Sequence, residues 1–253
     1  MKVCVLGSGS AGNATLIQSD DAAILVDAGF SAKELEKRLS LVNFNPEDID
    51  AILISHEHGD HIKGVSVFAR RYNTRVYLTQ GTAKASKGRG ISKTFIVPGE
   101  TFRVGDLEVE PFSVPHDAAE PVAFTIRRDG KNVVVLTDIG CVTVRAVEKL
   151  RKATLAVLES NHDPELLRDG PYPWRLKERI SGKLGHLSND ECSELLEHAG
   201  SGGLETVIFA HLSTTNNDAD IVRTAAESVF NGHGVDYEIA SQHEPGRIHE
   251  VKS

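Results

Sequence analysis

The 253-residue chain has little cysteine and no long apolar segment. Its three cysteines are an odd number, lie far apart and form no Cys-x-x-Cys pair. This pattern argues against a disulfide framework and against a cysteine metal site, and it predicts small buried thiols in a reducing compartment. The longest apolar runs fall well short of the roughly 20 residues that cross a bilayer, so we expect no membrane partner.

The chain also lacks a net positive charge and a visible export signal. Its formal net charge of −8 is not the signature of a non-specific nucleic-acid coat protein, although bound metals and a local basic patch can dominate the field at one site. Met1 and Lys2 run directly into the strand-like segment VCVLG, so we expect no secretory signal peptide and a cytoplasmic protein. No linker or repeat divides the chain, which predicts a single domain over residues 1–253.

A dense group of metal-ligand side chains follows an apolar segment. Residues 51–55 are typical of a short buried strand, and the sequence HEHGDH comes directly after them. Imidazole nitrogens and carboxylate oxygens are the ligands that Zn²⁺ and similar ions prefer. Since α/β proteins place their sites at the carboxyl ends of strands, a metal site is favoured over a polar loop rich in histidine by chance. The candidate ligands are His56, His58, Asp60 and His61, in a tight loop for which Gly59 would supply backbone freedom.

Other expected strands also end beside a ligand-type side chain. They place His116 after residues 107–114, Asp138 after residues 132–137 and His211 after residues 206–210. A structural role is the alternative for His116 and a capping or turn role for Asp138, but a site that already holds three histidines favours ligation. Asp27, at the end of an expected strand over residues 23–26, either orients a ligand imidazole or caps the helix expected over residues 31–39, for which Ser31 is the better cap.

The His-x-His-x-Asp-His arrangement resembles the signature of the metallo-β-lactamase-fold hydrolases. The resemblance implies an α/β fold, an αββα sandwich with a two-metal site at the sheet edge. Matching positions recur from Gly7 to Asn217, and the chain most resembles the YycJ/WalJ-type branch. The fold alone does not decide the reaction, because it hosts lactamases, thioesterases, lactonases and nucleases.

The resemblance also implies how two divalent ions are held. One ion would be bound by His56, His58 and His116 and the other by Asp60, His61 and His211, with Asp138 and a hydroxide between them. Zn²⁺ or Mn²⁺ suits these nitrogen and oxygen ligands, and Fe also fits. The hydroxide would be the nucleophile. Two divalent ions, two carboxylates and one hydroxide together carry a formal charge of roughly +1, which suits an anionic phosphodiester.

A glutamate and a further histidine indicate a proton donor. The order of Glu159, Gly-His-Leu-Ser at residues 185–188 and a strand ending in His-Leu-Ser resembles the ribonuclease Z type of phosphodiesterase. This resemblance implies that His186 is the general acid and that Glu159 orients it, with Asp60 as the third catalytic residue. A sugar alkoxide leaves poorly without a proton, whereas a thiolate leaves readily, so His186 favours a phosphodiesterase over a thioesterase.

Several polar and aromatic residues are candidate substrate contacts. The segment PYPW at residues 171–174 precedes four cations, and aromatic faces stack on bases while cations hold phosphates; a solvated helix with Trp174 packed inward is the alternative. Asn216 and Asn217 would cap the helix that follows them or donate to a phosphate. The basic segment 81–90 is expected to be a solvated helix face. Further strands are expected over residues 14–18 and 122–128 and an amphipathic helix over residues 62–72, and Ser188 with Glu191 predicts a capping box. The predicted substrate contacts are Asn13, His162, Tyr172, Arg175, Lys177, Ser213, Asn216 and Asn217.

The sequence therefore predicts a cytoplasmic two-metal phosphodiesterase, a DNA exonuclease whose partner is its nucleic-acid substrate. The alternative is a small-molecule hydrolase that acts on a cyclic phosphodiester, lactone or thioester at the same site. A metal-bound scaffold without turnover is disfavoured, because catalysis is the simplest reason to keep an open metal site. No segment resembles the protruding arm with which ribonuclease Z holds tRNA, which argues against tRNA processing. The oligomeric state stays open.

Overall fold

The computed structural model describes residues 1–86, 92–200 and 202–252. The chain forms two compact units that interleave along the sequence. Unit 1 comprises Met1–Ser113, Ala118–Lys131 and Ser241–Ser253, and unit 2 comprises Val114–Asp117 and Asn132–Ala240. The single domain over residues 1–253 stays a prediction. In the described part of the chain, no helix has the length and apolar character needed to cross a membrane.

Unit 1 contains a seven-stranded sheet in the order β14-β1-β2-β3-β4-β5-β6. Strands β14, β1, β2 and β3 pair antiparallel, while β3, β4, β5 and β6 pair parallel. The central parallel strands are uninterrupted apolar runs because both faces of such a sheet are covered. The bounds are β1 Lys2–Gly7, β2 Ala14–Gln18, β3 Ala23–Val26, β4 Ala51–Leu53, β5 Arg75–Leu78, β6 Lys93–Phe95 and β14 His249–Glu250.

Three further strands of unit 1 pair antiparallel: β7 (Phe102–Val104), β8 (Leu107–Ser113) and β9 (Val122–Arg128). In β8 the first four residues alternate between buried and partly exposed, as the pattern of apolar and charged residues predicts. The turn after β9 uses Asp129 and Gly130, both with positive φ, as a two-residue hairpin turn requires. The pattern did not predict β7.

The helices of unit 1 begin and end at local signals. The side chain of Ser31 accepts from the backbone of Glu34 and caps α1, as the sequence predicts. The single helix expected over residues 62–72 is two helices, because at Gly64 the chain runs against the backbone of Phe30, whose carbonyl oxygen lies 2.2 Å from where a Cβ would be. Part of the expected basic helix is present, and residues 87–91 lie outside the described residues. The bounds are α1 Ala32–Leu41, η1 Pro46–Asp48, α2 Gly59–Ile62, α3 Val65–Tyr72 and α4 Gln80–Ala85.

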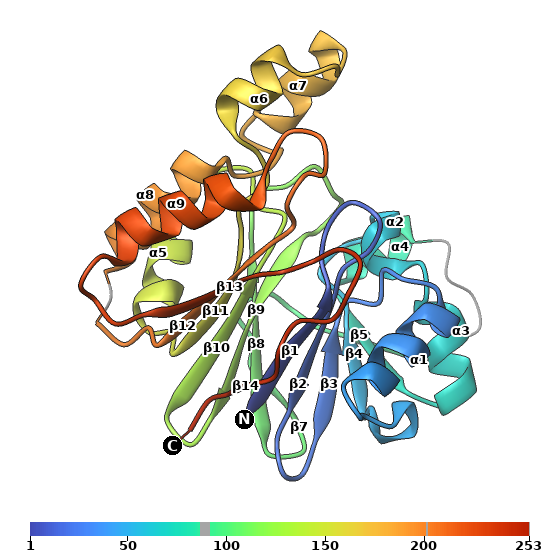
Figure 1. Cartoon of the computed structure of the whole chain (residues 1–253). Coiled ribbons are helices and arrows are strands. Elements are labelled where there is room, and N and C mark those ends of the chain that lie inside the picture. Colours follow the sequence, from blue (N-terminus) through green and yellow to red (C-terminus); the bar gives the residue numbers. More distant parts are fainter. Residues whose placement is uncertain (87–91, 201, 253) are drawn as a thin grey trace. The chain divides into compact units, whose positions relative to one another are not determined.

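Unit 2 contains four parallel strands in the order β13-β12-β11-β10. Because their carboxyl ends meet at one edge, the residues that follow β10, β11 and β12 are brought together there. Helices α5, α8 and α9 lie on one face of these strands (Figure 1). The bounds are β10 Lys131–Leu136, β11 Leu155–Glu159, β12 Thr206–Ala210, β13 Asp236–Ile239, α5 Val144–Arg151, α8 Asn189–Ala199 and α9 Ala219–Phe230.

Two short helices of unit 2 project beyond the carboxyl ends of these strands (Figure 1). They are α6 (Pro164–Asp169) and α7 (Trp174–Ile180), and we call residues 164–184 the α6–α7 arm. Leu167 is buried in α6, whereas α7 has no buried residue. The sequence pattern did not predict that this segment would project.

Candidate metal and catalytic site

In unit 1 the HEHGDH segment gathers three imidazole rings after the end of β4. His56 and His61 are almost fully buried, whereas His58 and Asp60 are partly exposed. The ring centroid of His56 lies 4.5 Å from that of His58 and 4.2 Å from that of His61. His58 precedes α2, and α2 carries Asp60 and His61 in its single turn. Side chains close in sequence are thus close in space here because one tight loop and one helical turn carry them all.

Asp27 supports this loop from the end of β3. Its Oδ2 lies 2.7 Å from Nδ1 of His61, and its two oxygens accept from the backbone N–H and the hydroxyl of Ser55 at 2.8 Å each. The Ser55 hydroxyl also lies 3.0 Å from Nδ1 of His56. Of the two interpretations of Asp27, the structure therefore shows the one in which Asp27 orients an imidazole. It also shows that Ser55 takes part in these contacts, which the sequence pattern did not predict.

The backbone around Asp60 is packed against two loops of the same unit. The backbone N–H of Asn13 donates to the carbonyl of Asp60 at 2.8 Å, and its amide lies 3.1 Å from Nε2 of His61. A Cβ at Gly29 would lie 1.6 Å from the same Asp60 carbonyl oxygen. Gly59 has no positive φ and nothing within 4 Å of its Cβ position, so the expected role of Gly59 in a strained turn is wrong. Gly29 is the glycine that the loop requires.

In unit 2 three side chains meet at the carboxyl ends of the parallel strands. Asp138 follows β10, Glu159 is the last residue of β11 and His211 follows β12. Among the described residues, six other than glycine have a left-handed backbone, and three of these are Asp27, Asp138 and His211. Such a conformation costs on the order of 1–3 kcal/mol, so the surrounding structure must hold these residues in place. It turns each side chain away from the direction that the strand would give it.

Glu159 is fully buried and makes four short contacts. Its Oε1 lies 2.9 Å from Nδ1 of His186 and 2.8 Å from Nδ1 of His211. Its Oε2 accepts from the backbone N–H groups of Ile139 and Leu187 at 3.0 and 3.1 Å. One carboxylate therefore orients two imidazoles and ties the loops after β10 and before α8 together.

These contacts shift the proton affinities of the pair. Burial alone would raise the pKa of Glu159, but the charge of His186 and the hydrogen bonds from His186 and His211 lower it. Burial alone would lower the pKa of His186, but the charge and hydrogen bond of Glu159, with the charge of Asp138, raise it. The imidazole of His186 therefore holds its proton more strongly than an ordinary histidine.

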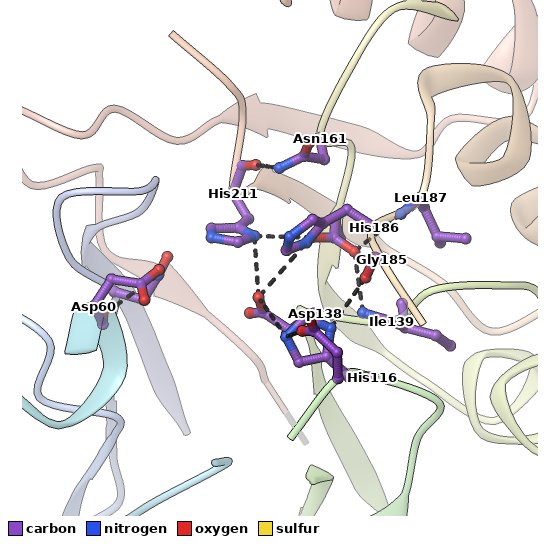
Figure 2. A network of polar contacts seen from close by, with 12 residues as sticks. Asp60, His116, Asp138, Ile139, Asn161, Gly185, His186, Leu187 and His211 are labelled. Carbon is purple, nitrogen blue, oxygen red and sulfur yellow. Dashed lines mark hydrogen bonds and ion pairs between the residues drawn. The ribbon is translucent and has the colours of Figure 1, made fainter. Parts of the chain in front are cut away.

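Asp138 faces three imidazole rings of unit 2 (Figure 2). Its Oδ1 lies 3.5 Å from Nδ1 of His211, 3.6 Å from Nδ1 of His186 and 3.7 Å from Nε2 of His116. Nδ1 of His116 lies 3.0 Å from the carbonyl oxygen of Gly185. Burial chiefly lowers the pKa of His116, which favours the neutral form that binds metals.

Four of the candidate histidine ligands share one feature that fits divalent metal ions. In each, Nδ1 lies within hydrogen-bonding distance of an oxygen, so that Nε2 is the nitrogen presented as a ligand. The pairs are His56 with Ser55, His61 with Asp27, His116 with Gly185 and His211 with Glu159. Imidazoles that bind metals almost always donate their other N–H to an oxygen in this way. In unit 2, atoms of Asp138, Glu159, His186 and His211 also lie within 4.8 Å of one another, as a metal-binding group requires.

The structure gives several predicted substrate contacts an internal position. His162 is buried, its backbone carbonyl accepts from Asn189, and in the described part of the chain its Nδ1 has no hydrogen-bond partner. The hydroxyl of Ser213 accepts from the backbone of Asn216, whose side chain is fully buried. The amide of Asn217 donates to the carbonyl of Ser160. Contact of these residues with substrate stays a prediction.

Two predictions about helix caps in unit 2 can be compared with the structure. Asp218, whose side chain accepts from the backbone of Asp220, caps α9, so the prediction that Asn216 or Asn217 caps it is wrong. Ser188 and Glu191 form the predicted capping box of α8.

The other predicted substrate contacts lie on the α6–α7 arm. There, Tyr172 is partly exposed, Arg175 is exposed and the amine of Lys177 donates to the carbonyl of Arg168.

Comparison with known proteins identifies the family. The family described as the β-lactamase superfamily domain matches residues 22–212. The exodeoxyribonuclease WalJ of Streptococcus pneumoniae is 38% identical over 250 residues, which cover 94% of this chain and 93% of WalJ. The exodeoxyribonuclease YycJ of Bacillus anthracis is 37% identical over 235 residues, 91% of this chain and 89% of YycJ. The chain therefore belongs to the β-lactamase superfamily, in the branch that includes WalJ and YycJ.

A solved structure confirms the fold. The metallo-β-lactamase fold protein YhfI from Bacillus subtilis matches with a TM-score of 0.75 and 21% identity, covering 98% of this chain and 99% of YhfI. The predicted fold class, the metallo-β-lactamase type of α/β fold, is confirmed. The chain is a metal-dependent hydrolase, as the HEHGDH motif predicted, and the histidine and carboxylate clusters support binding of divalent metal.

Proposed function

We propose that the protein is a metal-dependent exonuclease that degrades DNA. Relatives named as exodeoxyribonucleases match more than nine tenths of the chain, which supports a nuclease of this family. Within the chain, the observation that carries the proposal is the buried Glu159 carboxylate bound to His186 beside Asp138. Cleavage of a phosphodiester releases a sugar alkoxide, which needs such a proton donor.

The proposed metal ligands remain the seven predicted ones. They are His56, His58, Asp60 and His61 in unit 1, and His116, Asp138 and His211 in unit 2. When bound, two divalent ions supply Lewis acidity that ionises water near neutral pH and offsets negative charge on the phosphate. Zn²⁺ and Mn²⁺ both suit the nitrogen and oxygen ligands, and Fe also fits. Asp27, Ser55 and Glu159 orient the imidazoles before any ion binds.

His186 acts as the general acid in this proposal. Nδ1 is held by Glu159, so Nε2 is the nitrogen that gives its proton to the departing sugar oxygen as the phosphorus–oxygen bond breaks. Because Glu159 raises the pKa of His186, the imidazole keeps that proton to a higher pH than an ordinary histidine does. The side chain of His186 is 21% exposed, so a DNA strand in solvent can approach it.

The test compares two substrates with different leaving groups. End-labelled single-stranded DNA should be shortened by the Mn²⁺- or Zn²⁺-loaded protein, and His186→Ala should slow this by about 100-fold to 10,000-fold. Bis(p-nitrophenyl) phosphate releases a nitrophenolate that needs no proton, so its hydrolysis should change far less. His198→Ala, on the exposed surface of α8, is the matched control and should leave both rates unchanged.

Each other outcome rejects a defined part of the proposal. Equal loss of both activities in His186→Ala would show that His186 is needed for the metal site or the fold rather than for proton donation. DNA shortening that His186→Ala leaves intact would keep the nuclease and remove the acid. No shortening of DNA or RNA with any metal would instead support the small-molecule hydrolase.

A further inference from the structure

Trp174 is the only tryptophan of the chain, and it lies on the surface of the α6–α7 arm. Its side chain is 68% exposed, so the alternative in which it packs inward is wrong. Exposing a large indole forgoes the hydrophobic stabilisation of burying it, about 25 cal/mol for each Å² of apolar surface. Tryptophan is enriched at interfaces, so its exposure on a projecting arm supports a contact surface where charge and position point the same way.

The arm carries positive charge in an otherwise acidic chain. The arm contains five cations and three carboxylates, and residues 171–184 hold four of these cations and only one of the carboxylates, Glu178, whereas the whole chain has a net charge of −8. Arg179 is neutralised by Asp117 at 2.6 Å. In the described part of the chain, no hydrogen bond or ion pair is formed by the side chains of Arg175 and Lys183, which are both exposed. Both cations follow Trp174 in the sequence, Arg175 directly after it and Lys183 beyond the end of α7, and they match the charge of a phosphate backbone.

The arm is also fixed directly to the catalytic loop of unit 2. The backbone N–H of His186 donates to the carbonyl of Ile180 at 2.9 Å, and that of Gly185 donates to Gly182 at 2.7 Å. A Cβ at Gly185 would lie 2.1 Å from the Ile180 carbonyl oxygen, so the chain returns tightly at the end of α7. The seven residues of α7 span about 10 Å, which places Trp174 roughly that far from the turn that leads to His186.

We propose that the α6–α7 arm holds an unpaired DNA strand, with a base stacked on Trp174 and phosphates held by Arg175 and Lys183. The inference rests on the proposed exonuclease function and names the form of the substrate. Bases inside a duplex are stacked on both faces, so an indole can stack only on a base of a single strand or a frayed end. Stacking of this kind tolerates any base sequence, as a general exonuclease requires.

The indole provides its own probe of this contact. Because Trp174 is the sole tryptophan, its fluorescence reports on the arm alone. Titration of the metal-loaded wild-type protein with a phosphorothioate oligothymidylate, which resists cleavage, should quench that fluorescence. A blunt duplex of the same length should quench it much less. Absence of quenching by the single strand would overturn the proposal.

Variants separate stacking from folding and from charge. Trp174→Ala should weaken binding of a labelled single strand between about 5-fold and 150-fold, and Trp174→Phe, which keeps a ring, should lose less. Val144→Ala, at an equally exposed apolar residue on α5, is the control and should bind as wild type. Glu178→Gln removes the one carboxylate of residues 171–184, one turn from Trp174, and should strengthen binding slightly. An unchanged affinity in Trp174→Ala would reject the arm as a stacking site.

The outcomes also distinguish this inference from the proposed function. Trp174→Ala should lose more activity on DNA than on bis(p-nitrophenyl) phosphate, because that substrate is too small to span the arm, and equal losses on both would overturn the arm contact. Quenching by a strand that the wild-type protein never shortens would reject the nuclease and support the arm contact. Shortening of DNA without quenching would overturn the arm contact and leave the nuclease standing.

Discussion

The candidate site residues of the two units are brought together in different ways. In unit 1 one loop and one helical turn carry His56 to His61, so these candidate ligands are neighbours in sequence. In unit 2 Asp138, Glu159, His186 and His211 come from separate segments and meet because parallel strands end at one edge. The group in unit 1 therefore depends on local chain geometry, whereas the group in unit 2 depends on strand order and on one buried carboxylate.

The largest effect is expected from removing that carboxylate. Glu159→Gln leaves an amide facing two imidazoles and two backbone N–H groups, so it cannot accept from all of them. Breaking a buried charged pair costs about 3–5 kcal/mol, which we expect in the free energy of unfolding measured with urea. Glu197→Gln, on the exposed face of α8, should cost less than about 0.5 kcal/mol. Equal stabilities of the two variants would contradict the central role of Glu159.

An intermediate effect is expected from the glycines of the unit 1 loop. Gly29→Ala places a Cβ 1.6 Å from the Asp60 carbonyl oxygen, so the backbone must move, at a cost of about 1–3 kcal/mol and with loss of bound metal. Gly59→Ala meets nothing within 4 Å at the start of α2 and should be neutral or stabilising by up to about 1 kcal/mol. Thermal unfolding and metal content of both variants test the contrast, and a larger loss in Gly59→Ala would reverse it.

The smallest effect is a pH dependence that we assign to unit 2. In the metal-free protein the raised pKa of His186 stabilises the fold fully below 6.5, and this contribution is lost as the pH rises through the raised value. The lowered pKa of Glu159 stabilises the fold above 4.5, and this contribution is lost as the pH falls through the lowered value. The difference in unfolding free energy between wild type and His186→Gln should therefore shrink as the pH rises above neutral. A difference that grows with pH would show that the pair does not act in this way.

Local patterns predicted most strands and several caps. The residue ranges of β2, β3, β9 and β12 were predicted to the residue, because short apolar runs bounded by polar or turn residues mark strands clearly. The capping box of α8 was also predicted, since its signal lies within four residues. The break at Gly64 and the cap at Asp218 were missed, because they depend on where Phe30 lies and on which of three adjacent polar residues is placed to cap.

The sequence by itself determined the family, the fold class and the close grouping of candidate ligands in the HEHGDH segment. It could do so because the spacing of these residues is local and any strand followed by this loop brings them together. Only the tertiary structure decided that Glu159 holds two imidazoles, that Gly29 rather than Gly59 meets Asp60, and that Trp174 is exposed. These features depend on which segments lie beside each other after folding, and burial and close contact are properties of that arrangement rather than of any one stretch of chain.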